Sequence, residues 1–256
     1  MPVEAALRYW TTRGNSDRSP TAVCPRCTSP RYEAWSRAKL QAWTLARLAR
    51  LAPGGRFRRV VDLGCGTGDW AELLAPIADE IVVVDVSPGF VDQAAERLRR
   101  LSHPRWRAEC CDVRRFDDIE GADLVFLGCV LTYLDEPDVL EMLRKVRSRM
   151  APDGLVYQRD YCAARPHSKE LRTDTADYFS VQRWALRYLA LAEACGLRVI
   201  ECRPSWWVYG DQWATERLAC CGPAAVRAGS AAARAVFGAA ALASRACSYT
   251  FLYSAR

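Results

Sequence analysis

The stretch "VVDLGCGTGDW", residues 60–70, decides the fold. Three glycines alternate at Gly64, Gly66 and Gly68, directly after a short apolar run. Because glycine has no Cβ, such a turn between a strand and its helix lets backbone lie directly against a ligand. The turn also directs the first N–H groups of the helix toward a carboxylate or a phosphate. The stretch therefore predicts a small-ligand site at the end of a first strand.

Strand and helix patterns alternate along the chain on both sides of this stretch. Apolar runs predict strands over residues 58–63, 80–86, 105–113, 121–131, 155–161, 197–203 and 248–255. Helical spacing and cap residues predict helices over residues 68–77, 87–101, 136–150 and 180–196. A short helix over 4–10 and a longer one from Arg31 come first. The alternation predicts an α/β fold with a doubly wound parallel sheet.

Three acidic residues lie at successive strand ends. Asp62 precedes the glycines, and Asp85 ends the second strand, where a carboxylate can accept both hydroxyls of a ribose. Asp112 ends the third strand, where it can accept an exocyclic amine such as adenine N6. The glycine spacing is G-x-G-x-G, whereas the dinucleotide fingerprint is G-x-G-x-x-G. Together these features indicate an adenosyl ligand.

Over roughly residues 59–203 the sequence resembles the class I S-adenosylmethionine-dependent methyltransferases. The resemblance is carried by "VVDLGCGTGDW", "VVVDVSPGFVDQA", "AECCDV", "ADLVFLGCVLTYL" and "MAPDGLVYQRDY". It implies a seven-stranded sheet whose last strand is antiparallel, with S-adenosylmethionine as cofactor and S-adenosylhomocysteine as product. Implied cofactor-binding residues are Asp62, Gly64, Cys65 and Gly66 (methionyl end), Asp85 and Val86 (ribose), Asp112 and Val113 (adenine), Gly128 within 127–129 (sulfonium), and Tyr9, Trp10 and Arg13 (closing over the cofactor).

The chain divides into two parts on this reading. Residues 1–58 form an N-terminal helical lid, and residues 59–256 form the cofactor-binding domain. A helical insertion over 206–246 precedes the last strand and begins with four aromatic residues, Trp206, Trp207, Tyr209 and Trp213. Flat aromatic side chains make suitable walls for an aromatic acceptor, and they also suit plain packing.

The acceptor site leaves a weaker mark in the sequence. Tyr133 lies in "VLTYL", where many small-molecule relatives carry a histidine, but a neutral tyrosine is a poor base. Asp160, Tyr161 and His167 follow the fifth strand, at the edge of the sheet where ligands bind. These four residues are the catalytic candidates, with His167 as a base and the others orienting the acceptor.

We expect a small-molecule acceptor, with an indole- or phenol-like specialised metabolite methylated at carbon, nitrogen or oxygen as the leading choice. A tRNA base methyltransferase is the alternative, because "GLVYQRDY" also resembles the tRNA 3-methylcytidine methyltransferases and the net charge is +6. Nucleic acid is the less favoured partner, since charges of both signs alternate along the helices. A non-catalytic cofactor-binding subunit is the third interpretation. The sequence leaves the oligomeric state open.

Cysteine content and hydropathy bear on location. The chain has twelve cysteines and an N-terminus without an apolar signal segment, so we expect reduced thiols and a cytoplasmic protein. Cys24 and Cys27 form half of a zinc motif with no second pair nearby, so we expect no bound metal. The alanine-rich tail is interrupted by Arg227, Arg234 and Arg245, which argues against a membrane span.

Overall fold

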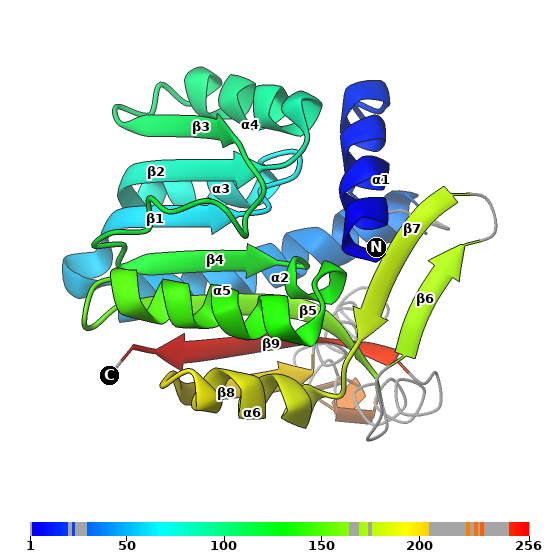
Figure 1. The fold of residues 1–256 in the computed structure, drawn as a ribbon. Helices are drawn as coiled ribbons and strands as arrows, with labels where there is room; N and C mark the ends of the chain where they lie inside the picture. The colour runs from blue at the N-terminus through cyan, green and yellow to red at the C-terminus, as the bar shows by residue number, and fades with distance from the viewer. Residues whose placement is uncertain are drawn as a thin grey trace.

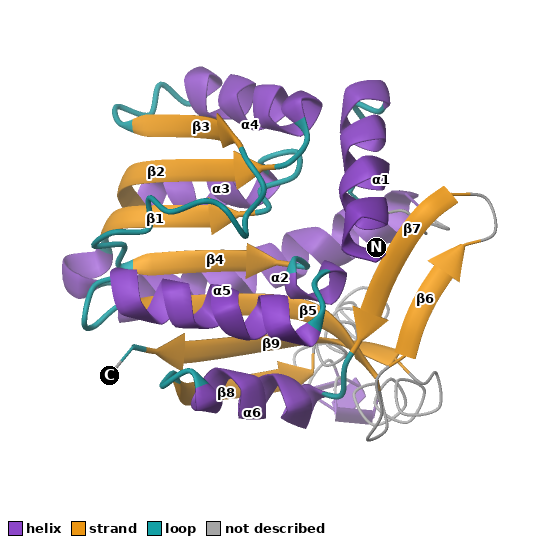
Figure 2. Ribbon diagram, viewed as in Figure 1, coloured by secondary structure: helices purple, strands orange, loops and turns teal. Residues whose placement is uncertain are grey.

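The structure is a computed structural model of the 256-residue chain. It describes residues 2–19, 22–23, 30–163, 169–173, 176–204, 224–225, 228–229, 231–232 and 246–255. These residues form one seven-stranded sheet with helices on both faces, and a separate two-stranded hairpin (Figures 1 and 2).

The large sheet has the strand order β3-β2-β1-β4-β5-β9-β8. Its members are β1 (Phe57–Leu63), β2 (Ala78–Asp85), β3 (Trp106–Cys110), β4 (Leu124–Gly128), β5 (Leu155–Ala163), β8 (Arg198–Pro204) and β9 (Ala246–Ser254). The first five strands run parallel, and β9 runs antiparallel to both β5 and β8. The predicted doubly wound sheet with an antiparallel last strand is therefore confirmed.

Alternate side chains of the central strands feed two separate hydrophobic cores. Val61 and Val125 face the core under α5 (Glu136–Arg149) and α6 (Ala185–Ala194). Val60 and Leu124 face the opposite core, which is covered by α2 (Pro30–Leu51), α3 (Asp69–Leu74) and α4 (Pro88–Arg100). Burial on both faces explains why these strands read as continuous apolar runs.

The order of the strands reverses at β1, which pairs with β2 on one side and with β4 on the other. In an open parallel sheet this switch point opens a crevice at the carboxyl ends of the strands. The helix α1 (Pro2–Ser16) stands across these ends, and the hairpin of β6 (Lys169–Thr173) and β7 (Ala176–Gln182) lies beside it (Figure 1).

Two sequence expectations are corrected here. The first helix covers fifteen residues instead of the short segment 4–10. The helix expected over 180–196 begins only at Ala185, because Ser180, Val181 and Gln182 belong to β7. Phe179, Ser180 and Val181 are all buried, and the ladder that pairs Phe179 with Arg172 and Val181 with Glu170 makes this segment a strand.

Several expectations fall outside the described residues. These include His167, the cysteines of the "CPRC" motif and the four aromatics at the start of the predicted insertion. The division into parts at residue 58 stays a prediction. Among the residues that the structure does describe, no helix is both long and apolar enough to cross a bilayer. That same part of the chain contains no cluster of three or more His, Cys, Asp or Glu side chains that could hold a metal ion.

Candidate functional site

The glycine turn between β1 and α3 presents bare backbone to the crevice. Gly64 and Gly66 have positive φ angles of 77° and 51°. A Cβ at Gly64 would lie 2.3 Å from Val130 Cγ2, and one at Gly66 would lie 2.6 Å from Val23 Cγ1. Both backbone conformation and space therefore require glycine at these two positions.

Asp85 joins this turn to the start of α4. Its Oδ2 accepts the Gly66 N–H at 2.9 Å, and its Oδ1 accepts the Ser87 N–H at 2.9 Å. The residue is only 7% exposed. Burial raises the pKa of Asp85 to about 6, although these hydrogen bonds from the backbone oppose the shift. The carboxylate is thus fixed in place at the end of β2.

Asp62 lies on the neighbouring strand and is 1% exposed. Among the residues that the structure describes, its Oδ2 has no hydrogen-bond partner. Burial and then the charge of Asp85 raise the pKa of Asp62 to about 8. An unsatisfied buried carboxyl oxygen costs free energy, so this atom is suited to a polar ligand group.

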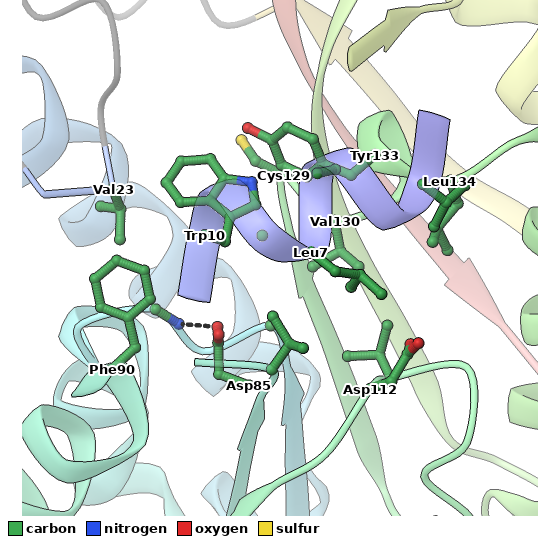
Figure 3. A pocket seen from close by; sticks show the side chains of 17 residues that line it. Leu7, Trp10, Val23, Asp85, Phe90, Asp112, Cys129, Val130, Tyr133 and Leu134 are labelled. Carbon is green, nitrogen blue, oxygen red and sulfur yellow. Dashed lines mark hydrogen bonds between the residues drawn. The ribbon is translucent and has the colours of Figure 1, made fainter. Parts of the chain in front are cut away.

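A cavity of about 120 Å³, called here the ligand cavity, opens beside the turn (Figure 3). Eight of the predicted cofactor-binding residues line it: Trp10, Gly64, Gly66, Asp85, Val86, Asp112, Val113 and Gly128. The other lining residues are Val3, Ala6, Leu7, Val23, Phe90, Cys129, Val130, Tyr133 and Leu134. The structure thus brings together most of the predicted set, whereas Tyr9, Arg13, Asp62 and Cys65 are not among the lining residues.

Asp112 reaches the cavity from beyond the third strand, since β3 ends at Cys110 and not at residue 113 as expected. Arg114 donates to Asp112 from Nε at 3.0 Å and from its terminal nitrogen at 2.7 Å, and it also donates to Asp138 of α5 at 3.0 Å. Burial opposes ionisation, but the hydrogen bonds and charge of Arg114 lower the pKa of Asp112 below its ordinary value. Asp112 is therefore an oriented carboxylate.

One face of α1 forms the cover of the ligand cavity. Val3, Ala6, Leu7 and Trp10 line it, and steps of three and four place residues on one side of a helix. Figure 3 shows Leu7 and Trp10 pointing from α1 into the cavity, opposite Asp85 and Asp112. That spacing is the signal that could have identified Val3 and Leu7 from the sequence.

Arg13 is held by contacts at the end of α1. Its Nε donates to the Ala22 carbonyl at 2.5 Å, and its guanidinium lies 3.2 Å from the Asp17 carboxylate. Tyr9 packs edge-on against Trp10, with ring centroids 5.1 Å apart. Both residues support α1 from outside the ligand cavity, and their assignment to the cofactor stays a prediction.

The strand β4 delivers backbone to the floor of the cavity through Gly128 and Cys129. Cys129 has a φ of 61°, which is uncommon for a residue with a side chain. Its N–H donates to the Arg159 carbonyl at 2.6 Å, which holds this conformation. Local strain of this kind concentrates at ligand sites.

Of the four catalytic candidates, Tyr133 is the one that the structure places on the ligand cavity. It lies in the 3-10 turn η3 (Leu131–Tyr133), and its ring packs edge-on against Trp10 with centroids 5.3 Å apart. Asp160 is fully buried behind this turn. Tyr161 is 40% exposed, and its ring centre lies 5.8 Å from the Arg159 guanidinium carbon. His167 lies outside the described residues.

Comparison with known proteins agrees with this geometry. Residues 60–154 match a family described as a methyltransferase domain. The chain is 38% identical over 102 residues to nodulation protein S of Bradyrhizobium diazoefficiens, covering 39% of this chain and 47% of that protein. It is 35% identical over 120 residues to trans-aconitate 2-methyltransferase of Methylobacterium nodulans, covering 46% of this chain and 42% of that protein. The matches thus span less than half the length of these curated relatives.

The structure is also similar in fold to a solved methyltransferase. The crystal structure of the N-methyltransferase NodS from Bradyrhizobium japonicum WM9, in complex with S-adenosyl-L-homocysteine, superimposes with a TM-score of 0.59 at 17% identity. The superposition covers 99% of this chain and 97% of that one. The likeness extends over the whole fold, including elements outside residues 60–154.

Proposed function

We propose that the protein transfers a methyl group from S-adenosylmethionine to a small molecule, because residues 60–154 match a methyltransferase domain and the fold is that of a solved methyltransferase. The observation that carries this proposal is the bare glycine turn with buried carboxyls on two adjacent strands, Asp62 and Asp85. When bound, S-adenosylmethionine supplies an electrophilic methyl group on a positively charged sulfur. The protein then has to bind the cofactor and the acceptor, orient the acceptor atom toward the methyl group, and enclose both molecules.

The described residues fit such a cofactor. Asp85 offers a fixed carboxylate for ribose hydroxyls, although its oxygens also hold the turn. Asp112, oriented by Arg114, is suited to accept the adenine amine beside Val113. Asp62 does not line the cavity, but its Oδ2, which no described residue satisfies, is suited to the ammonium group of the methionyl end. Trp10 would then cover the cofactor from α1.

An apolar or aromatic small molecule is the acceptor class that we favour. The cover and side of the ligand cavity consist of apolar and aromatic groups such as Leu7, Tyr133 and Leu134, and no basic side chain lines it in the described part of the chain. Binding of a polynucleotide relies on contacts between basic side chains and phosphates, so this lining gives no support to the tRNA alternative. One relative is a trans-aconitate 2-methyltransferase, which is named for a small-molecule acceptor, and the solved neighbour NodS is an N-methyltransferase.

Acceptor handling is assigned by position. We propose that Tyr133, which lines the cavity, contacts the acceptor. Tyr161 in β5 and His167 remain candidates. Where the acceptor must lose a proton, we propose that His167 takes it. Asp160 contributes through the turn that it holds, because its two oxygens are already bonded to Thr132 and Gln158.

Calorimetry with S-adenosylhomocysteine tests the cofactor site. We expect Asp85→Ala to weaken binding at least tenfold, through loss of roughly 1.5–3 kcal/mol of charged hydrogen bonding. Asp79→Ala is the matched control, since Asp79 lies at the other end of β2 and pairs with Arg56 at 2.8 Å on the surface. Equal affinities in the three proteins would remove Asp85 from the site. Absence of binding by the unaltered protein would refute the proposed function.

A further inference from the structure

A buried guanidinium holds the turn that forms one wall of the ligand cavity. Arg183 lies between β7 and α6 and is 2% exposed. Its two terminal nitrogens donate to the carbonyl oxygens of Leu131 at 2.9 Å and Leu134 at 2.6 Å. The planar fork of arginine thus spans the whole of η3, from its first residue to the residue after its last.

The same turn is held from the β5 side by a buried carboxyl. Asp160 Oδ1 accepts the Thr132 N–H at 3.2 Å, and its Oδ2 accepts from Gln158 Nε2 at 2.8 Å. The Tyr253 hydroxyl donates to Gln158 Oε1 at 2.9 Å. Arg183 therefore donates to two carbonyl groups of the turn, while Asp160 accepts one of its N–H groups.

One further bond joins the β6–β7 hairpin to the turn, and a second joins the residue after β7 to the end of β5. Thr132 Oγ1 donates to the Val181 carbonyl of β7 at 3.1 Å. The Arg183 carbonyl accepts the Ala163 N–H from the end of β5 at 2.9 Å. Arg183 thus lies where β5, β7 and η3 meet, and its side chain links the hairpin to the cavity wall.

The position of η3 decides the shape of the ligand cavity. Val130, Tyr133 and Leu134 lie within or next to the turn, and all three line the cavity. Val130 is also the residue that a Cβ at Gly64 would strike. Burying the charged guanidinium costs desolvation free energy, which an apolar side chain of similar volume would not cost. Its placement therefore indicates a role in holding the wall.

We propose that Arg183 is a positioning residue for cofactor binding, which fixes η3 so that Tyr133 and Leu134 form the wall of the ligand cavity. This assignment rests on the proposed function, because the ligand it serves is S-adenosylmethionine. It goes beyond that function by tying the cofactor site to the β6–β7 hairpin. Arg183 itself does not touch the cavity.

Arg183→Met and Arg187→Met form a matched pair of variants. Both remove one guanidinium at or near the start of α6, but Arg187 is exposed and pairs with Glu136 at 2.7 Å. Two measurements are made on each. Hydrogen exchange of the Thr132, Tyr133 and Leu134 amides in the ligand-free protein reports on the turn, and calorimetry reports the affinity for S-adenosylhomocysteine. Exchange is compared with amides of β1 and β2 in the same sample.

We expect Arg183→Met to speed hydrogen exchange in the turn at least tenfold relative to β1 and β2. We also expect it to lower the affinity for S-adenosylhomocysteine at least tenfold. Arg187→Met should change neither quantity. Arg183→Lys keeps the charge but cannot bond both carbonyl groups with a rigid fork, so its affinity should lie between those of Arg183→Met and the unaltered protein. If Arg183→Met does not fold, Arg183→Lys takes its place in both measurements.

Unchanged exchange in the turn, or unchanged affinity despite faster exchange, would overturn the assignment. Exchange that rises equally in η3, β1 and β2 would also overturn it, because it would mark a general loss of stability. If the unaltered protein does not bind S-adenosylhomocysteine, the proposed function and this assignment both fail. If it binds normally and only the variant result is negative, the proposed function stands alone.

Discussion

At the scale of single residues, the site is dominated by two buried carboxyls that share one glycine turn. Asp85 has two backbone N–H donors, whereas the Oδ2 atom of Asp62 has no donor among the described residues. The charge of Asp85 adds to burial in raising the pKa of Asp62 to about 8. Asp62 is thus neutral near pH 7 in the ligand-free protein, and a positively charged ligand group would favour its ionised form.

Binding of S-adenosylmethionine should therefore release protons. The expected release at about pH 6.5 is up to one proton per cofactor, because Asp62 is protonated in the free protein and is favoured to ionise beside a cation. Cofactor affinity should accordingly rise as pH increases from about 6 to 8. Calorimetry in two buffers with different ionisation enthalpies measures the release. Besides Asp85, the buried Cys65 thiol is the titratable group coupled to Asp62, and its pKa is raised well above neutrality.

Asp62→Asn is the control for this release, since it keeps the shape of the side chain and removes the titrating group. The variant should bind with nearly the same heat in both buffers. Equal heats for the unaltered protein would contradict the assignment of a neutral Asp62.

Local sequence was informative for residues whose role is set by their own strand or turn. Gly64, Gly66 and Asp85 follow from the order of strand, turn and helix alone. Arg114 could not be predicted as the partner of Asp112, because that contact depends on side-chain direction. The bond from Arg13 to the Ala22 carbonyl could likewise not be predicted, because it depends on how the chain after α1 folds back.

At the scale of elements, α1 covers the ligand cavity because its C-terminal end packs against the start of α4 with backbone atoms in direct contact. A Cβ at Gly89 would lie 2.2 Å from the Gly14 carbonyl oxygen, and one at Gly14 would lie 2.1 Å from Ser87 Oγ. The Gly89 N–H donates to Asn15 Oδ1 at 3.0 Å. Two glycines far apart in the sequence thus allow one close contact, which no local pattern could reveal.

Gly89→Ala should displace α1 and lower the affinity for S-adenosylhomocysteine at least fivefold. The added methyl group would collide with the backbone of Gly14, which has no rotatable side chain to move aside. Gly121→Ala is the control, since a methyl group there meets nothing within 4 Å. The control carries backbone strain at φ 65° and should lower stability without changing affinity. Calorimetry with both variants makes the test, and equal affinities would show that the cover does not depend on this contact.

The β6–β7 hairpin was not predicted from the sequence. The segment 176–182 combines strand spacing with an immediate continuation into a helix at Ala185, so one helical pattern could be extended through both. The β5 strand also runs two residues past its predicted end, to Ala163. The β5 extension is held by its ladder with the distant strand β9, and β7 is held by its pairing with β6. Strand pairing of this kind overrides local preference.

At the scale of the whole molecule, buried carboxyls tie the stability of the ligand-free fold to pH. Burial raises the pKa of Asp160 to about 7, and it raises those of Asp62 and Asp85 as well. A carboxyl whose pKa is higher in the folded state holds its proton there after the unfolded chain has lost it. Its contribution is therefore fully favourable below about pH 4 and is lost as pH rises toward the folded pKa.

Asp160→Asn should remove one such contribution without breaking the network around η3. The asparagine oxygen can still accept the Thr132 N–H, and Gln158 can turn its amide so that its oxygen faces the new amide group. Relative to the variant, the unaltered protein should lose stability between about pH 4 and 7, by at most ~1.4 kcal/mol per pH unit. Urea unfolding of both proteins across this range measures the difference, in which the titration of all shared groups cancels. Parallel stability curves would mean that Asp160 is ionised in the folded protein at neutral pH, held so by Arg183.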